Sequence, residues 1–295
     1  MLYRPPRVRG ALIASILTGW AGILAGLLFV RAVTLDVSLA MFLAYVGSIS
    51  CAGLAALLLY WTQAIVTLRY IVDRNALAIQ FGGVRQLIPL TSIERLIPGR
   101  NVAEPQISGL NAPGLHVGRG FVERVGDTLF YSTHTKRDQL LYVVTAEKSY
   151  ALTVEDPSAF AQAIQDRQGK EVVKTRQGPI RTTLSAQGFW SDPAAYALLA
   201  LAVLLGLSLG GYVFWRYPGL PGSMEFAFPP LGGVVRVAAR KEILQIPFTA
   251  LAILAVNIAI GLLVHRVERM AAYVLWGSAA MLQLLFCVAA YTALT

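Results

Sequence analysis

The sequence predicts a bundle of five membrane-spanning helices and one inserted polar domain, built mainly of strands and closed by a helix. Of the 295 residues, 56% are hydrophobic and only 14% are charged, whereas soluble domains carry about 25% charged residues. Five apolar stretches without interior charge surround a polar block from Ile65 to Trp190. Because 18 or more apolar residues can cross the roughly 30 Å hydrocarbon core as a helix, these stretches are typical of an integral membrane protein.

Each apolar stretch is long enough to span a bilayer at about 1.5 Å per residue. The predicted spans are Ala11–Val30, Leu39–Tyr60, Ala194–Phe214, Phe248–Val264 and Ala271–Leu294. The first exceeds the usual 7 to 15 residues of a secretory h-region, and no convincing small-residue cleavage site follows, so we expect a retained anchor.

The spans divide the chain into six predicted segments. These are the N-terminal tail with the first two helices (1–64), the polar domain (65–170), a linker (171–190), the third helix (191–214), an extracytoplasmic loop rich in proline and glycine (215–247) and the last two helices (248–295).

The distribution of Lys and Arg predicts the orientation in the membrane. The tail carries three of these residues, the first connection only Arg31, and the polar block fifteen. This places the N-terminus and the polar domain in the cytoplasm and the C-terminus outside the plasma membrane. Four basic residues in segment 215–247 run against the rule. The net charge of +9 is scattered through short polar segments, so it indicates topology and not a nucleic-acid partner.

In the polar block the apolar pattern changes from continuous to alternating, which is typical of half-buried strands. Residues 70–88 predict three antiparallel strands, with turns at Asp73–Asn75 and at Gly82-Gly83. Residues 128–133, 139–145 and 149–154 predict a second meander. Asp156 followed by Pro157 predicts the start of one short closing helix, with Phe160, Ala163 and Ile164 on one face.

The runs Tyr70 to Gly82, Ile88 to Leu96, Phe130 to Thr133 and Tyr142 to Phe160 resemble a bacterial pleckstrin-homology-like (PH-like) domain attached to membrane spans. The resemblance implies a seven-stranded β-barrel closed by a C-terminal helix, and an adaptor role. Eukaryotic relatives hold phosphoinositides with several basic residues in the first hairpin loop. That loop offers only Arg74 here, so we expect no specific phosphoinositide binding.

The segment from Tyr217 to Pro247 resembles a Leu-Pro, glycine-turn and Leu-x-x-Pro membrane domain of unknown function, and the similarity continues through Asn257 and the turn Arg266 to Arg269. Relatives commonly place a histidine before the aromatic residue, where this chain has Ala227-Phe228. We therefore expect a hairpin-like structural cap without a metal or proton ligand.

The chain lacks the common catalytic signatures, including Gly-x-Ser-x-Gly, His-Glu-x-x-His and Cys-x-x-Cys. We expect His116, His134 and His265 to be surface or loop residues, and Cys51 and Cys287 to be unrelated thiols inside spans. The sequence therefore predicts a non-enzymatic protein, with no catalytic residue, cofactor or metal ion.

The predicted spans contain no acidic, basic or histidine side chain, and Asn257 and Gln283 are their main polar residues. An interhelical hydrogen bond from such a side chain contributes about 1 kcal/mol, so both are candidates for helix packing. Glycine pairs in the first and third spans let helices approach closely, and they favour intramolecular packing over homo-oligomerisation. The pairs are Gly22 with Gly26 and Gly206 with Gly210.

A charge-free bundle joined to a cytosolic binding fold favours an accessory, scaffold or sensory subunit whose domain binds a protein through a sheet edge or barrel rim. One alternative is a transporter-like or permease-accessory protein that uses the bundle. Another is lipid sensing through Arg69, Lys136 and Arg137 near the membrane surface.

Overall fold

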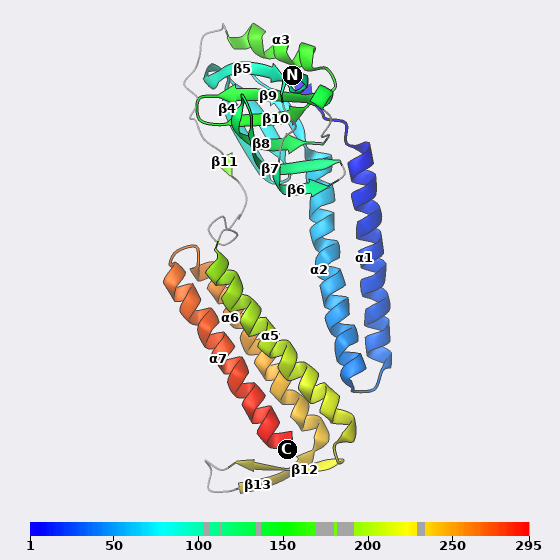
Figure 1. The fold of residues 1–295 in the computed structure, drawn as a ribbon. Coiled ribbons are helices and arrows are strands. Elements are labelled where there is room, and N and C mark those ends of the chain that lie inside the picture. The colour runs from blue at the N-terminus through cyan, green and yellow to red at the C-terminus, as the bar shows by residue number, and fades with distance from the viewer. Residues whose placement is uncertain are drawn as a thin grey trace. The chain divides into compact units, whose positions relative to one another are not determined.

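The computed structural model describes residues 1–102, 107–112, 114–133, 137–168, 180–181, 192–228 and 234–294. Five helices in this part of the chain are long and apolar enough to cross a membrane, as predicted (Figure 1). They are α1 (Val8–Thr34), α2 (Leu39–Thr67), α5 (Pro193–Arg216), α6 (Gln245–Val264) and α7 (Arg269–Leu294). The chain forms two compact units, Met1–Ile23 with Cys51–Leu184 and Leu24–Ser50 with Ser185–Thr295.

The first unit holds two β-sheets. One sheet has the order β1-β2-β3-β4-β11, all neighbours antiparallel. Its strands are β1 (Leu2–Tyr3), β2 (Arg69–Val72), β3 (Ala76–Phe81), β4 (Val84–Pro89) and β11 (Ile180–Arg181). The three predicted antiparallel strands are therefore confirmed, and the turn between β3 and β4 uses Gly82 at a φ of +57°, which glycine adopts without strain.

The other sheet has the order β5-β9-β10-β8-β7-β6. Its strands are β5 (Ile93–Pro98), β6 (Ser108–Ala112), β7 (Leu115–Val122), β8 (Gly126–Ser132), β9 (Leu140–Thr145) and β10 (Ser149–Thr153). The hairpin of β9 and β10 is confirmed. The predicted meander is wrong for β8, which pairs with β10 in parallel because β9 lies between β5 and β10.

The predicted closed barrel is also wrong. Among the described strands no backbone ladder joins the two sheets, whose edge strands are β1 and β11 in the first sheet and β5 and β6 in the second. The edge of β4 is paired with β11 at Val84 and Arg85, so this edge does not close onto the second sheet. The result is a sandwich that stays open beside β4.

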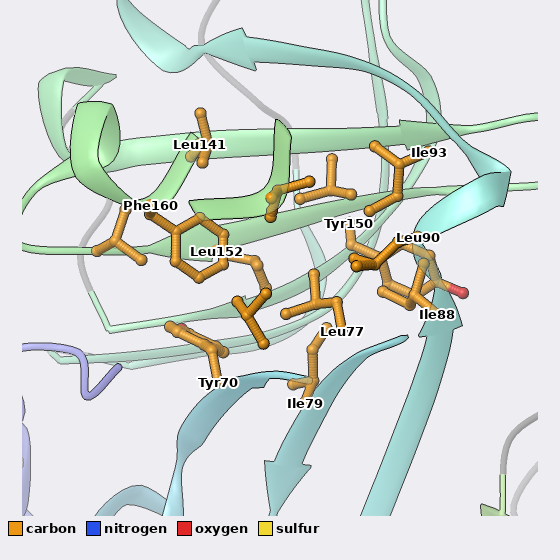
Figure 2. Close-up of a cluster of buried hydrophobic side chains, with 14 of the residues drawn as sticks. Tyr70, Leu77, Ile79, Ile88, Leu90, Ile93, Leu141, Tyr150, Leu152 and Phe160 are labelled. Atoms are coloured by element: carbon orange, nitrogen blue, oxygen red, sulfur yellow. The ribbon is translucent and has the colours of Figure 1, made fainter. Parts of the chain in front are cut away.

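A hydrophobic core fills the space between the sheets (Figure 2). The helix α3 (Pro157–Gln168) closes it, as predicted, with Phe160, Ala163 and Ile164 buried. Asp156 caps this helix, since its Oδ1 accepts from the backbone N–H of Ser158 and Ala159 at 3.0 Å each. A second core, which includes Val122, Phe130 and Tyr142, covers the other face of the second sheet.

The second unit contains α5, α6 and α7 packed together, together with the ends of α1 and α2 that their connection joins. Buried clusters lie between the three helices along their length, and Trp276 of α7 is the largest fully buried side chain. Between α5 and α6 the chain forms the antiparallel hairpin of β12 (Ser223–Phe228) and β13 (Val234–Ala239), which agrees with the hairpin-like cap expected from the sequence.

Short 3-10 turns complete the described elements. They are η1 (Leu90–Ser92), η2 (Gly99–Asn101), η3 (Arg137–Gln139), η4 (Tyr217–Gly219) and η6 (Arg240–Leu244).

Candidate functional site

The start of the chain is built into the first sheet. The Met1 ammonium donates to the carbonyl of Val72 at 2.8 Å, and β1 pairs with β2. Behind this strand, the Tyr3 ring lies edge-on to Phe160, with 4.8 Å between the ring centroids. The N-terminus and the β-sandwich therefore lie on the same side of α1.

Two hairpin turns of the sandwich rest directly on the ends of α1 and α2. A Cβ added to Gly10 of α1 would lie 2.6 Å from the carbonyl oxygen of Gly114, which precedes β7 and has a φ of +81°. At the other turn, Gly82 lies against Ala64, and its N–H donates to Thr67 Oγ1 at 3.0 Å. The Arg7 guanidinium also donates to the carbonyl of Val66 and so joins the two helices.

We call these contacts the helix junction. Its members are Arg7 just before α1, Gly10 on α1, Ala64, Val66 and Thr67 on α2, and the turns at Gly82 and Gly114. At Gly10 the helix backbone lies so close to the Gly114 backbone that no side chain fits between them. The sandwich is therefore fixed to two helix ends and is not suspended on a linker.

A cleft of about 650 Å³ opens between the sheets beside β4. We call it the open cleft. The open cleft is lined by side chains of β4, β7, β8 and β10. On β7, Val117 and Arg119 lie opposite Tyr131 and Leu129 of β8, which pack against the core, so these β7 side chains also face the space between the sheets. Its polar and charged lining includes Gln86, Arg119, Tyr131, Lys148 and Tyr150.

The floor of the open cleft is polar. Gln86 Nε2 donates to the Tyr150 hydroxyl at 3.2 Å, and both residues are buried. Burial, followed by the neighbouring Tyr131, raises the pKa of Tyr150, so its hydroxyl keeps its proton and can donate. The cleft can therefore offer a hydrogen-bond donor to a bound group while its walls remain partly apolar.

The predicted membrane-surface residues do not gather into one site in the described part of the chain. Arg69 lies on β2, where its Nε donates to Gln80 Oε1 at 2.8 Å. Lys136 lies outside the described residues, and Arg137 begins η3 without a described side chain.

Of the four glycines predicted to pack helices together, two contact a neighbouring helix and two do not, among the described residues. Gly210 accommodates the Phe42 ring of α2, and Gly206 faces Leu254 and Gln283, whereas open space surrounds Gly22 and Gly26 among the described residues. In their place, Ser48 Oγ donates to the carbonyl of Ala25 at 2.9 Å between α1 and α2.

The two polar residues of the spans also differ. Gln283 of α7 is fully buried and donates to the carbonyl of Ala250 on α6 at 2.8 Å. Asn257 instead donates within its own helix, to the carbonyl of Ile253 at 2.9 Å. Of these two residues, Gln283 therefore makes the bond between helices.

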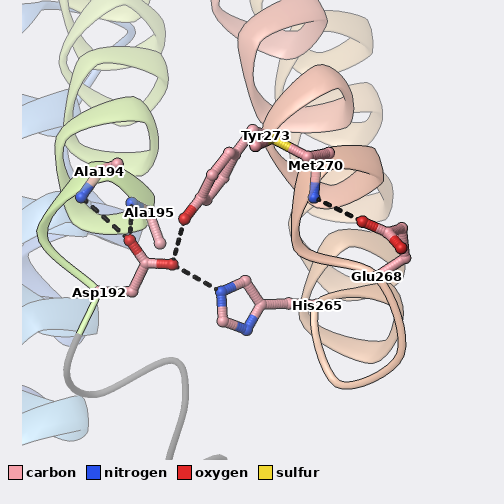
Figure 3. A network of polar contacts seen from close by, with 7 residues as sticks. All are labelled: Asp192, Ala194, Ala195, His265, Glu268, Met270 and Tyr273. Carbon is pink, nitrogen blue, oxygen red and sulfur yellow. Dashed lines mark hydrogen bonds and ion pairs between the residues drawn. The ribbon is translucent and has the colours of Figure 1, made fainter.

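A buried polar cluster lies at one end of the helices of the second unit, and Figure 3 shows its hydrogen bonds. Asp192 caps α5 through the N–H groups of Ala194 and Ala195 at 3.1 and 3.2 Å. Its other carboxylate oxygen accepts from Tyr273 Oη at 2.5 Å and from His265 Nε2 at 2.9 Å. Hydrogen bonds from Tyr273 and His265 lower the pKa of Asp192 to about 2, so it is ionised at neutral pH.

This end cluster, Asp192 with His265 and Tyr273, joins three helices at one point. His265 also stacks on Trp276, with 5.7 Å between ring centroids. The expectation of surface or loop histidines is wrong for His116, which is buried on β7. His265 does lie in the connection between α6 and α7, as expected, but it is buried, and His134 lies outside the described residues. The Asp192-Pro193 pair is a helix-start signal that could have located the carboxylate, but the sequence carries no signal for its two partners.

Residues 68–168 match the family model of the bacterial PH domain. The match begins after the last residue of α2 and ends with α3, so it covers β2 to β10 and α3 and leaves β1, β11 and the five long helices outside. The comparisons with curated proteins and with solved structures found no match.

We expect Gly10→Ala to loosen the helix junction, because the new Cβ would meet the Gly114 carbonyl, and overpacking of this kind costs about 1–3 kcal/mol. Amide hydrogen exchange in β7, measured by mass spectrometry on the detergent-solubilised chain, should become faster by roughly tenfold. Gly19→Ala is the matched control, since nothing lies near a Cβ at that position of α1 and alanine favours a helix. Equal exchange in the two variants would contradict the junction.

We expect Asp192→Asn to lower the melting temperature of the second unit at neutral pH. Because the folded pKa of Asp192 is lowered to about 2 from an unfolded value of about 3.9, its stabilisation is present above about pH 4 and lost as the pH falls toward 2. Melting followed by tryptophan fluorescence should show a smaller loss of stability over this interval in the variant than in the wild type. Asp36→Asn, at an exposed position, is the control, and parallel profiles for wild type and Asp192→Asn would refute the role of the end cluster.

Proposed function

The chain carries a bacterial PH domain joined to long apolar helices, and on this premise we propose that it is a multi-pass plasma-membrane protein whose PH domain recognises a protein partner at the cytoplasmic surface. In this role the protein is an accessory, scaffold or sensory subunit of a membrane complex. The observation that carries the proposal is an open cleft on a domain fixed to two apolar helix ends.

Fixing the domain supports recognition because less freedom is lost when a partner binds a surface that is already held in place. The helix junction places the turns at Gly82 and Gly114 against α2 and α1, while the open cleft lies between the sheets beside β4. If α1 and α2 span the bilayer, a partner bound in the cleft would be held close to the membrane.

The orientation in the proposal follows from charge. Since β1 belongs to the sandwich, the N-terminus and the PH domain share one side, and the three basic residues of the tail and the fifteen of the polar block favour the cytoplasm for both.

The ionisable residues of the second unit support a scaffold over a transporter. Asp192 precedes α5 and His265 follows α6, so the end cluster lies at helix ends. A proton or ion pathway calls for ionisable groups at membrane depth. Asn257, the polar residue nearest to such a role in the sequence, bonds to its own helix.

Lipid sensing receives less support than protein recognition. The Arg69 guanidinium is held by Gln80 on the same sheet, and the loop from Asp73 to Asn75 supplies one basic residue, whereas clustered phosphates call for several.

The orientation predicts which cysteines can be labelled from outside. In a chain with Cys51 and Cys287 replaced by alanine, Gly219→Cys should react with a membrane-impermeant maleimide on intact spheroplasts. Glu123→Cys, in the exposed turn after β7, should react only after the membrane is permeabilised. Labelling in the opposite order would reverse the topology.

Protein recognition predicts a discrete crosslink from the cleft. The photoreactive residue p-benzoylphenylalanine at Ala146, an exposed residue on the cleft rim, should give one defined protein adduct in irradiated cells. The same residue at Gln162, exposed on α3, should not give this adduct. If neither position captures a protein, or both capture the same mixture, the proposed function fails.

A further inference from the structure

The open cleft contains a buried donor without a described acceptor. The Tyr150 hydroxyl accepts from Gln86, and their side chains are 8% and 9% exposed. Among the described residues, the structure gives the hydroxyl hydrogen of Tyr150 no acceptor. Since a buried hydroxyl hydrogen without an acceptor is unfavourable, an oxygen acceptor on a bound ligand would be favoured at this position.

The rim of the open cleft is basic. Arg119 of β7 and Lys148, in the turn between β9 and β10, are both exposed and line the cleft, where Glu147 is the one acidic side chain of the described lining. Arg and Lys form their strongest hydrogen bonds with ionised oxygens. The rim and the Tyr150 hydroxyl therefore favour the same chemistry, an anionic oxygen.

At one end of β4, next to the open cleft, the strand edge already pairs with an extended segment of this chain. The two residues of β11 pair with Val84 and Arg85 in antiparallel register, and the following β4 residues, Gln86 to Pro89, line the cleft. Alternate side chains of an extended peptide point to opposite faces, so an extended peptide in the cleft would present every second side chain to the same wall. A cleft of about 650 Å³ is within the usual size of a ligand site.

We infer that the open cleft binds an extended acidic segment of the partner protein, with an Asp or Glu carboxylate held by the Tyr150 hydroxyl and by Arg119 and Lys148. This inference rests on the proposed function and names the chemistry of the partner. The carboxylate supplies the selectivity of this contact, because Arg and Lys form their strongest hydrogen bonds with ionised oxygens.

An oriented peptide library tests the inference, because it reads the side-chain preference of the cleft directly and needs no identified partner. The detergent-solubilised full chain is incubated with degenerate peptides in which one position at a time is fixed as each amino acid. Asp and Glu should be enriched several-fold at one position or at alternating positions. The double variant Arg119→Gln/Lys148→Gln should lose this enrichment, and Tyr150→Phe should weaken it.

The matched control is Arg74→Gln/Arg95→Gln, which removes two exposed arginines that do not line the cleft. It should keep the acidic preference. An absent preference, or one that persists in Arg119→Gln/Lys148→Gln, overturns the inference. Binding to phosphatidylglycerol vesicles through Arg119 and Lys148, without any acidic preference in the library, also overturns it and assigns the rim to lipid.

The crosslink at Ala146 distinguishes a failure of the acidic ligand from a failure of the proposed protein recognition. A protein adduct at Ala146 together with a neutral or basic preference in the library refutes only the acidic ligand. No protein adduct refutes the proposed function itself.

Discussion

The approach of two glycine backbones, Gly10 of α1 and Gly114 before β7, is the constraint on which the arrangement of the first unit depends. Any side chain at Gly10 would meet main-chain atoms that cannot rotate away, and Gly114 has a positive φ that disfavours other residues. Together with the turn at Gly82 against α2, this contact holds the sandwich at two separate points.

The open sandwich follows from how its strands are shared. The first sheet gains β1 from the N-terminal tail on one side and β11 on the other, so β4 is paired at one end without joining the second sheet. The core holds the two sheets together through Tyr70, Leu152 and Phe160, and through the hydrogen bond from the Tyr70 hydroxyl to the carbonyl of Tyr131 at 2.7 Å. A closed ladder is thus not needed for cohesion, and the gap beside β4 becomes available as a cleft.

Local sequence patterns predicted the elements well and their long-range pairings poorly. Apolar length predicted all five helices, and alternation with turn residues predicted β2 to β4 and the hairpin of β9 and β10, because these patterns are local. The position of β8 beside β10 and the addition of β1 and β11 depend on pairings across long stretches of chain, which no local pattern encodes. The same limit applies to the cleft, since Gln86 and Tyr150 meet only through the sandwich.

The end cluster explains how helices with charge-free spans can still be aligned with one another at one end. Packing among leucine and alanine side chains has little directional preference, and in lipid there is no hydrophobic force to align one helix with another. Asp192 gives the packing a direction because one carboxylate oxygen caps α5 and the other accepts from His265 after α6 and from Tyr273 of α7. An ionised group is tolerated there because two side-chain donors and two backbone donors surround it. Deeper in the bundle the same alignment is made by neutral Gln283 across to Ala250, where a carboxylate would be far more costly.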